Sequence, residues 1–290
     1  MPAHSQLAYM ASLDFGSRPP EEVARCLADI GYSAVEWTLA HFDPRTHTDD
    51  QIAAMVRATE AAGLGTSEVV VQRDFVRRDE MERADAVAHV AECIRAAARH
   101  GIGILNLFTG PAPWDPSAPK LGQEMGEGAA WEIVFRAFDE LVPLAEEMEV
   151  RLAVEAVFGM AARDYYTSLP LMSRHDSPSL GLNFDPSHYQ LYRNDIPWTV
   201  RQWGERIFHV HLKDCVGAPG GLPGETFTFP LLGEGTVDWP AFFAALDEIG
   251  YTGHLSVEFE AFTYYRTVLG SDPVKAAQLS MEQCRALLAR

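Results

Sequence analysis

The sequence is short of cysteine and has no long apolar run. Its 290 residues include four cysteines, Cys26, Cys93, Cys215 and Cys284, and no two of them form a CxxC pair. Neither a zinc knuckle nor a dithiol redox motif is therefore indicated. No apolar run approaches the roughly 20 residues that span a bilayer, and the N-terminal residues lack the basic segment of an export signal. We expect a soluble, cytoplasmic protein whose thiols are reduced.

Basic residues are also scarce. The chain has 23 Lys and Arg against 41 Asp and Glu, for a formal charge of -18. A surface of this sign repels nucleic acid and anionic lipid, so neither is expected as a partner. A cleft in which carboxylates converge would attract a cation instead, although an acidic surface alone gives the same composition.

Apolar residues make up 47% of the chain, enough for one domain of the size typical of barrels, here residues 1–290. Short apolar segments alternate with amphipathic ones, which predicts a parallel sheet; eight such units predict a (β/α)₈ TIM barrel. An open doubly wound sheet is the alternative, although no GxGxxG follows the first segment. The predicted strands are 7–11, 33–37, 65–71, 102–108, 150–156, 180–184, 206–212 and 254–260.

Three connections, 109–130, 185–195 and 213–235, are too long to be simple turns. Each follows a predicted strand, so in a barrel all three gather at the C-terminal face, where such enzymes have their active sites. Their glycine, proline and aromatic residues suit a lid over a small pocket. Taken singly, each is more typical of a variable surface loop.

The last four predicted strands each end in a side chain that can bind a metal: Glu155, Asp185, His211 and Glu258. Strand ends of a barrel converge, so these residues are expected to surround one ion. Three carboxylates and an imidazole suit Mn²⁺, Mg²⁺ or Co²⁺, with Mn²⁺ the expected ion. A solvated strand end, a turn cap or a core histidine explains each residue alone, but the coincidence in four successive units favours the metal site.

The motifs VEWT, VEAV, FDPSH, HVHLKD, LGEGTVDW and GHLSVEFE resemble those of the sugar phosphate isomerase/epimerase family, the xylose isomerase-like TIM barrels. The resemblance covers nearly the whole chain. It implies that Glu155, Asp185, His211 and Glu258 hold one divalent cation. It also implies that Glu155 and Glu258 are the catalytic acid/base pair and that His188 contacts the substrate.

The sequence departs from two branches of that family. Ketose 3-epimerases follow the seventh-strand histidine with GExNR, whereas His211 is followed here by LKDCVG, which is more similar to the inosose branches. Lys213 is therefore expected to reach the substrate. Endonuclease IV needs further Asp and His ligands for three zinc ions, and this loop lacks them. The departure and the acidic charge both disfavour DNA repair.

Other candidates are less specific. The resemblance puts Glu36 near the substrate, together with Trp37, although a buried structural hydrogen bond explains the glutamate equally well. His209 is expected to lie in the core or behind the metal ligands, and Asp238 to cap the following helix. An apolar wall for the carbon face of a sugar is expected from Trp114, Phe158, Tyr189, Phe227 and Phe229.

These observations predict an isomerase or epimerase that removes a proton next to the carbonyl of a keto-sugar or polyol through an enediolate. Two alternatives stay open. One is a dehydratase or lyase acting on an oxidised sugar, inositol or glycoside by the same first step. The other is a non-catalytic sugar-binding barrel or complex subunit. No glycine-rich phosphate cradle is evident, and a homo-oligomer is compatible with the sequence.

Overall fold

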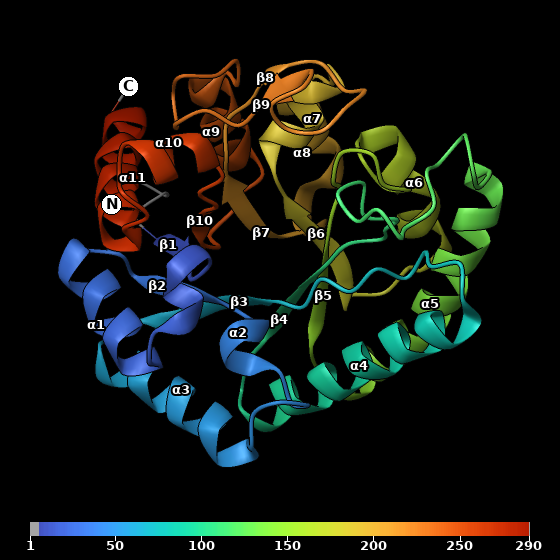
Figure 1. The fold of residues 1–290 in the computed structure, drawn as a ribbon, viewed down its shortest axis with the longest axis horizontal. Helices are drawn as coiled ribbons and strands as arrows, with labels where there is room; N and C mark the ends of the chain where they lie inside the picture. The colour runs from blue at the N-terminus through green and yellow to red at the C-terminus, as the bar shows by residue number, and fades with distance from the viewer. Residues whose placement is uncertain (1–5, 290) are drawn as a thin grey trace.

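The computed structural model describes residues 6–289. Its parallel strands form a closed barrel in the order β1-β10-β7-β6-β5-β4-β3-β2, with helices around the outside (Figure 1), which confirms the predicted (β/α)₈ fold. Closure is completed where β1 pairs with both β2 and β10. The barrel strands are β1 Leu7–Met10, β2 Ala34–Thr38, β3 Gly65–Val70, β4 Ile104–Leu107, β5 Arg151–Glu155, β6 Leu180–Phe184, β7 Ile207–Leu212 and β10 Leu255–Val257.

The helices begin and end at ordinary capping residues. Thr48 forms a reciprocal capping box with Gln51 at the start of α3, and Gly31 ends α1 with a left-handed φ of 107° that suits glycine. Asp238 caps α9 by accepting from the Ala241 amide, as expected. The α-helices are α1 Pro20–Ile30, α2 Leu39–Phe42, α3 Asp49–Ala61, α4 Glu80–Arg99, α5 Glu127–Glu147, α6 Tyr165–Arg174, α7 Pro186–Leu191, α8 Ile196–Trp203, α9 Trp239–Glu248, α10 Phe262–Thr267 and α11 Pro273–Leu288.

The three long connections are only partly irregular. The connection after β4 continues to Gly126, the residue before α5, and the segment 185–195 contains α7. The connection after β7 contains a two-stranded antiparallel hairpin, β8 Val216–Gly217 and β9 Phe227–Thr228. Figure 1 shows this hairpin on the same side of the barrel as α7. Within the described residues, no helix is long and apolar enough to cross a membrane.

A single buried carboxylate, that of Asp214, organises the connection after β7. Its oxygens accept hydrogen bonds at 2.9 to 3.1 Å from the amides of Cys215, Gly233, Gly235 and Val237 and from the Trp239 indole. A Cβ added at Gly235 would lie 2.0 Å from Asp214 Oδ1, so the close approach requires glycine there. The HVHLKD and LGEGTVDW motifs thus form one structural unit.

We expect Asp214→Asn to lower the free energy of unfolding by about 2–4 kcal/mol. The NH₂ group of the new side chain would face, in a buried place, some of the N–H groups that now donate to the Asp214 carboxylate. Denaturant unfolding measures the effect. Asp238→Asn is the matched control, since Asn caps a helix as well as Asp does and the change should stay within about 0.5 kcal/mol. Equal losses in the two variants would contradict the anchoring role of Asp214.

Candidate metal centre

The four predicted metal ligands meet at the C-terminal end of the barrel. Glu155 ends β5, Asp185 follows β6, His211 lies in β7 and Glu258 follows β10. One ligand atom from each lies within 4.8 Å of every other. Asp185 and His211 are fully buried, Glu155 is nearly so, and the Glu258 side chain is 13% exposed. Three carboxylates and one imidazole nitrogen therefore face a common point, which is the donor set of a divalent-cation site.

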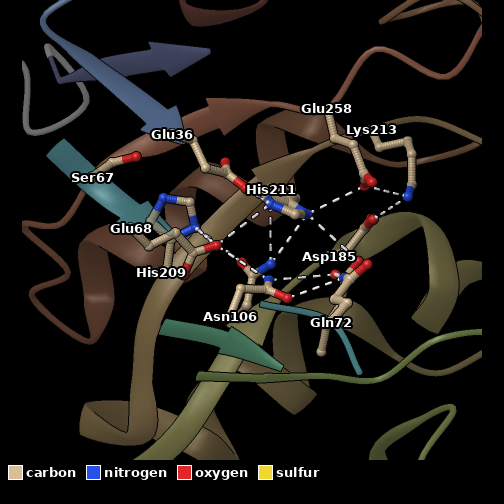
Figure 2. Close-up of polar contacts among 12 residues, drawn as sticks. Glu36, Ser67, Glu68, Gln72, Asn106, Asp185, His209, His211, Lys213 and Glu258 are labelled. Carbon is tan, nitrogen blue, oxygen red and sulfur yellow. Dashed lines mark hydrogen bonds and ion pairs between the residues drawn. The ribbon is translucent and has the colours of Figure 1, made fainter. Parts of the chain in front are cut away.

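The geometry distinguishes the two ring nitrogens of His211. Nδ1 lies 3.5 Å from Glu155 Oε1 and 3.2 Å from Glu258 Oε2, so it faces the cluster. Nε2 lies 2.9 Å from Glu36 Oε1, on the other side of the ring. Figure 2 shows the imidazole between Glu36 on one side and Glu258 on the other. A metal-binding histidine that donates its other N–H to a carboxylate has a fixed tautomer and orientation.

Burial and neighbouring charges shift the pKa values of the residues in the cluster. Burial by itself lowers the pKa of His211, but the carboxylates of Glu36, Glu155 and Glu258 outweigh it and hold that pKa well above its ordinary value. Burial would raise the pKa of Glu155, yet His211 and His188 hold it well below its usual range. The imidazole cation thus supplies part of the positive charge that these carboxylates need.

A second layer of polar side chains lies deeper in the barrel and consists of residues that are at least 99% buried. Asn106 Nδ2 donates to Glu68 Oε1 at 3.1 Å, and His209 Nδ1 lies 3.0 Å from the same oxygen. Burial raises the pKa of Glu68 to about 8 and lowers that of His209 to about 3, so both are neutral near pH 7. The members of this layer are Glu36, Glu68, Asn106, Asn183 and His209. Figure 2 shows Glu68, His209 and Asn106 below His211.

Sequence reasoning placed His209 behind the ligands, as found, but missed Glu68, Asn106 and Asn183. A signal was present for two of them, because Asn106 and Asn183 each lie between apolar neighbours in a short strand, and side chains alternate between the two faces of a strand. Glu68 follows Ser67 and lacked this signal. Gln72 was missed as well. Its amide donates to Asn106 Oδ1 at 3.0 Å and to Glu155 Oε2 at 2.9 Å, and so connects the two layers.

Lys213 lies next to the cluster with its ammonium almost fully buried. Its Nζ is 2.9 Å from Asp185 Oδ2 and 3.1 Å from Glu260 Oε2, and it also contacts Glu258. Burial lowers the pKa of Lys213, but these carboxylates reverse the effect and keep the lysine charged. His188 Nε2 lies 3.4 Å from the same ammonium. Glu260, which sequence reasoning did not single out, thus belongs to the site.

A cavity of about 480 Å³, the inner cavity, opens over the cluster. Glu155, His188, Lys213 and Glu258 line it, as do the missed residues Gln72 and Glu260. Among the predicted wall residues, Trp114 and Phe158 also line it. Phe227 and Phe229 pack against Phe158, with ring centroids 4.8 and 6.1 Å away, and support the wall from behind.

Three predicted contacts lie elsewhere. Trp37 is fully buried and donates through its indole to Thr59 on α3, so it faces the helices outside the barrel because it alternates with Glu36. Tyr189 stacks on Phe184, with centroids 4.3 Å apart, and does not line the inner cavity. Glu36 is fully buried and contacts His211 Nε2. None of the three residues lines the inner cavity, so the geometry does not support the expected substrate contacts of Trp37 and Glu36 or the wall position of Tyr189.

The fold and the cluster together define a (β/α)₈ barrel with a carboxylate and histidine site at its C-terminal face. The chain belongs to the xylose isomerase-like TIM barrel family, whose model matches residues 24–287. The family assignment made from the motifs is thereby confirmed.

Individual relatives are distant. The SgbU protein of Escherichia coli, whose name is a provisional assignment as an L-ribulose-5-phosphate 3-epimerase, is 27% identical over 240 residues, or 79% of each chain. The inosose isomerase of Bacillus velezensis is 28% identical over 146 residues, which span 49% of this chain and about half (51%) of that protein. The structure of the IOLI protein with a bound zinc atom has a TM-score of 0.78 at 18% identity and covers 98% of both chains, which shows the shared fold.

We expect Glu36→Gln to weaken the binding of a divalent ion about tenfold to a hundredfold, because the amide still accepts a hydrogen bond from His211 but removes a buried negative charge behind the ligand. Calorimetric titration of the metal-free protein with Mn²⁺ and Zn²⁺ measures this. Glu60→Gln, at an exposed position of α3, is the control and should bind as the unaltered chain does. Unchanged affinity in Glu36→Gln would show that Glu36 does not support the site.

Proposed function

We propose that this protein is a divalent-metal-dependent isomerase or epimerase that moves a proton next to the carbonyl of a keto-sugar or related polyol. The observation that carries the proposal is the position of Glu155 and Glu258. Their carboxylates lie 3.5 and 3.2 Å from His211 Nδ1, and both line the inner cavity. A substrate carbon in this cavity would have two carboxylates within reach.

Glu155, Asp185, His211 and Glu258 would hold the ion, and the oxygen-rich set favours Mn²⁺. The bound ion would supply a Lewis acid that polarises a carbonyl and stabilises an enediolate. Burial opposes ionisation of Glu258, but Lys213 and His211 lower its pKa to about 2, and the pKa of Glu155 is also held low. Both glutamates are therefore ionised at neutral pH and ready to accept a proton.

The two glutamates would have different roles in the proton transfer. One takes the proton from the carbon beside the carbonyl, and the other returns a proton either to the opposite face of the same carbon or to the neighbouring carbon. The first outcome is epimerisation and the second is isomerisation. His188 and Lys213 point into the inner cavity, where their N–H groups can donate to substrate oxygens. The names of the two relatives, one an epimerase and one an isomerase, support this class of reaction.

Elimination is the second candidate. Its support is the contact between His188 and Lys213, whose nitrogens lie 3.4 Å apart at the wall of the inner cavity. An imidazole next to an ammonium is a competent proton donor for a departing hydroxyl. The first step, removal of the proton beside the carbonyl, is common to both reactions, so one experiment addresses both.

We expect the enzyme, loaded with Mn²⁺ in D₂O, to place deuterium at the carbon beside the carbonyl of a keto-sugar or keto-inositol, because a carboxylate that takes a proton exchanges it with solvent. Mass spectrometry reads the result. A deuterated isomer of unchanged formula supports isomerisation or epimerisation, and a deuterated product that has lost water supports elimination. Glu155→Gln and Glu258→Gln should each lower turnover by about 10²–10⁴.

The controls separate catalysis from folding and metal binding. Circular dichroism and metal titration of each Gln variant show whether it is folded and loaded, and Glu60→Gln should turn over normally. Near-native turnover in a loaded Glu155→Gln or Glu258→Gln variant would remove that residue from the proposed role. Turnover with neither deuterium uptake nor slowing by deuterium at the reacting carbon of the substrate would exclude proton abstraction altogether.

A further inference from the structure

The inner cavity does not end at the metal centre. A second hollow of about 690 Å³, the outer cleft, lies next to it, and the two share the side chains of Trp114, Phe158 and Leu222. The two hollows therefore adjoin at Trp114, and a ligand held over Glu155 and Glu258 that extends beyond the inner cavity on this side would meet the outer cleft. One sugar ring engaged by the metal centre would occupy the inner cavity and leave the outer cleft free.

The outer cleft is lined by rigid apolar groups. Pro111, Pro113, Pro116 and Pro119 line it, and the indole of Trp114, which is 49% exposed, separates it from the inner cavity. Proline rings and an exposed indole offer flat faces that pack against another ring. An exposed tryptophan at the opening of a polar cavity is better explained by contact with a ligand than by packing in the core.

Contacts among three loops hold this surface in place. The Trp114 ring packs edge-on against Phe108, with centroids 6.0 Å apart, and lies 5.8 Å from the ring of Phe158. Gly159 approaches Pro113 so closely that an added Cβ would lie 3.0 Å from it, and its amide donates to the Tyr192 hydroxyl at 3.2 Å. The cleft is thus preorganised, which lowers the entropy cost of binding.

Charge indicates which kind of group the outer cleft accepts. Asp115, Glu124 and Glu225 line it, against a single basic side chain, that of Lys120. Asp115 and Glu124 are already paired with Arg77 and Arg78. A phosphate here would meet the carboxylate of Glu225, two ion-paired carboxylates and one ammonium, that of Lys120, but no free guanidinium, so the surroundings favour a neutral group.

We propose that the substrate is a glycoside: an oxidised sugar in the inner cavity that carries a second, neutral ring in the outer cleft, stacked on Trp114. This inference rests on the proposed function, because it assumes that the reacting sugar lies over Glu155 and Glu258. The second ring is either a further sugar or an aromatic aglycone, which share a flat apolar face.

Non-reactive glucosides test the cleft without catalysis. Calorimetry with the Mn²⁺-loaded protein compares methyl β-D-glucoside, phenyl β-D-glucoside, cellobiose and glucose 6-phosphate. Phenyl β-D-glucoside, cellobiose or both should bind roughly tenfold more tightly than the methyl glucoside, as expected for a ring stacked on an indole. Whichever ring gives the gain identifies the second group as aromatic or sugar.

Trp114→Ala should remove that tenfold gain. The control variant Trp198→Ala, which changes a 38%-exposed tryptophan on α8, should keep the gain. The ratio of ring-bearing to methyl glucoside is the readout, so a general loss of affinity cancels. Equal affinities for all neutral glucosides, an unchanged ratio in Trp114→Ala, or tightest binding of glucose 6-phosphate would overturn the inference. If a free keto-sugar takes up deuterium but ring-bearing glucosides bind no better than the methyl glucoside, only this inference is wrong. If ring-bearing glucosides bind better but no deuterium is taken up, only the proposed function is wrong.

Discussion

The structure depends on the need for positive charge among carboxylates buried at the end of a barrel. Glu155, Asp185 and Glu258 converge where water is scarce, and burial alone would raise the pKa of Glu155 and of Glu258. The His211 and His188 imidazoles and the Lys213 ammonium lie next to these carboxylates and compensate part of their charge. A divalent ion at the point they share would satisfy all three carboxylates together, and Glu36 and Gln72 hold the surrounding donors in position.

The same constraint explains the polar interior. Barrel interiors are usually filled by branched apolar side chains, whereas here Glu36, Glu68 and Asn106 occupy places below the cluster. Each has at least one partner that leads towards His211 or Glu155. None of these residues lines the inner cavity. Their position indicates that they orient the ligands, at the cost of burying groups that a purely structural core would leave out.

Much of this arrangement could be predicted from the sequence. The strict alternation of short apolar and amphipathic segments determined the barrel, and chain order then required the ends of 150–156, 180–184, 206–212 and 254–260 to meet. The predictions that the structure does not support concern the direction in which a side chain points. Trp37 follows Glu36 and so faces the opposite side of β2. Tyr189 lies on the helix 186–191, which stacks its ring on Phe184. The five hydrogen bonds to Asp214 join residues up to 25 positions apart, and no local pattern indicates such a closure.

Loops adapt the common barrel to its ligand. Asp214 fixes the connection that carries β8 and β9, and Trp114 projects from the connection after β4 over the same cavity. The cluster below these loops nevertheless decides whether the protein binds a metal. Anomalous diffraction from crystals grown with Mn²⁺ locates the ion. One peak is expected, at bonding distance from Glu155, Asp185, His211 Nδ1 and Glu258. A peak at another place, or none with Mn²⁺ in excess, would contradict a metal site at this cluster.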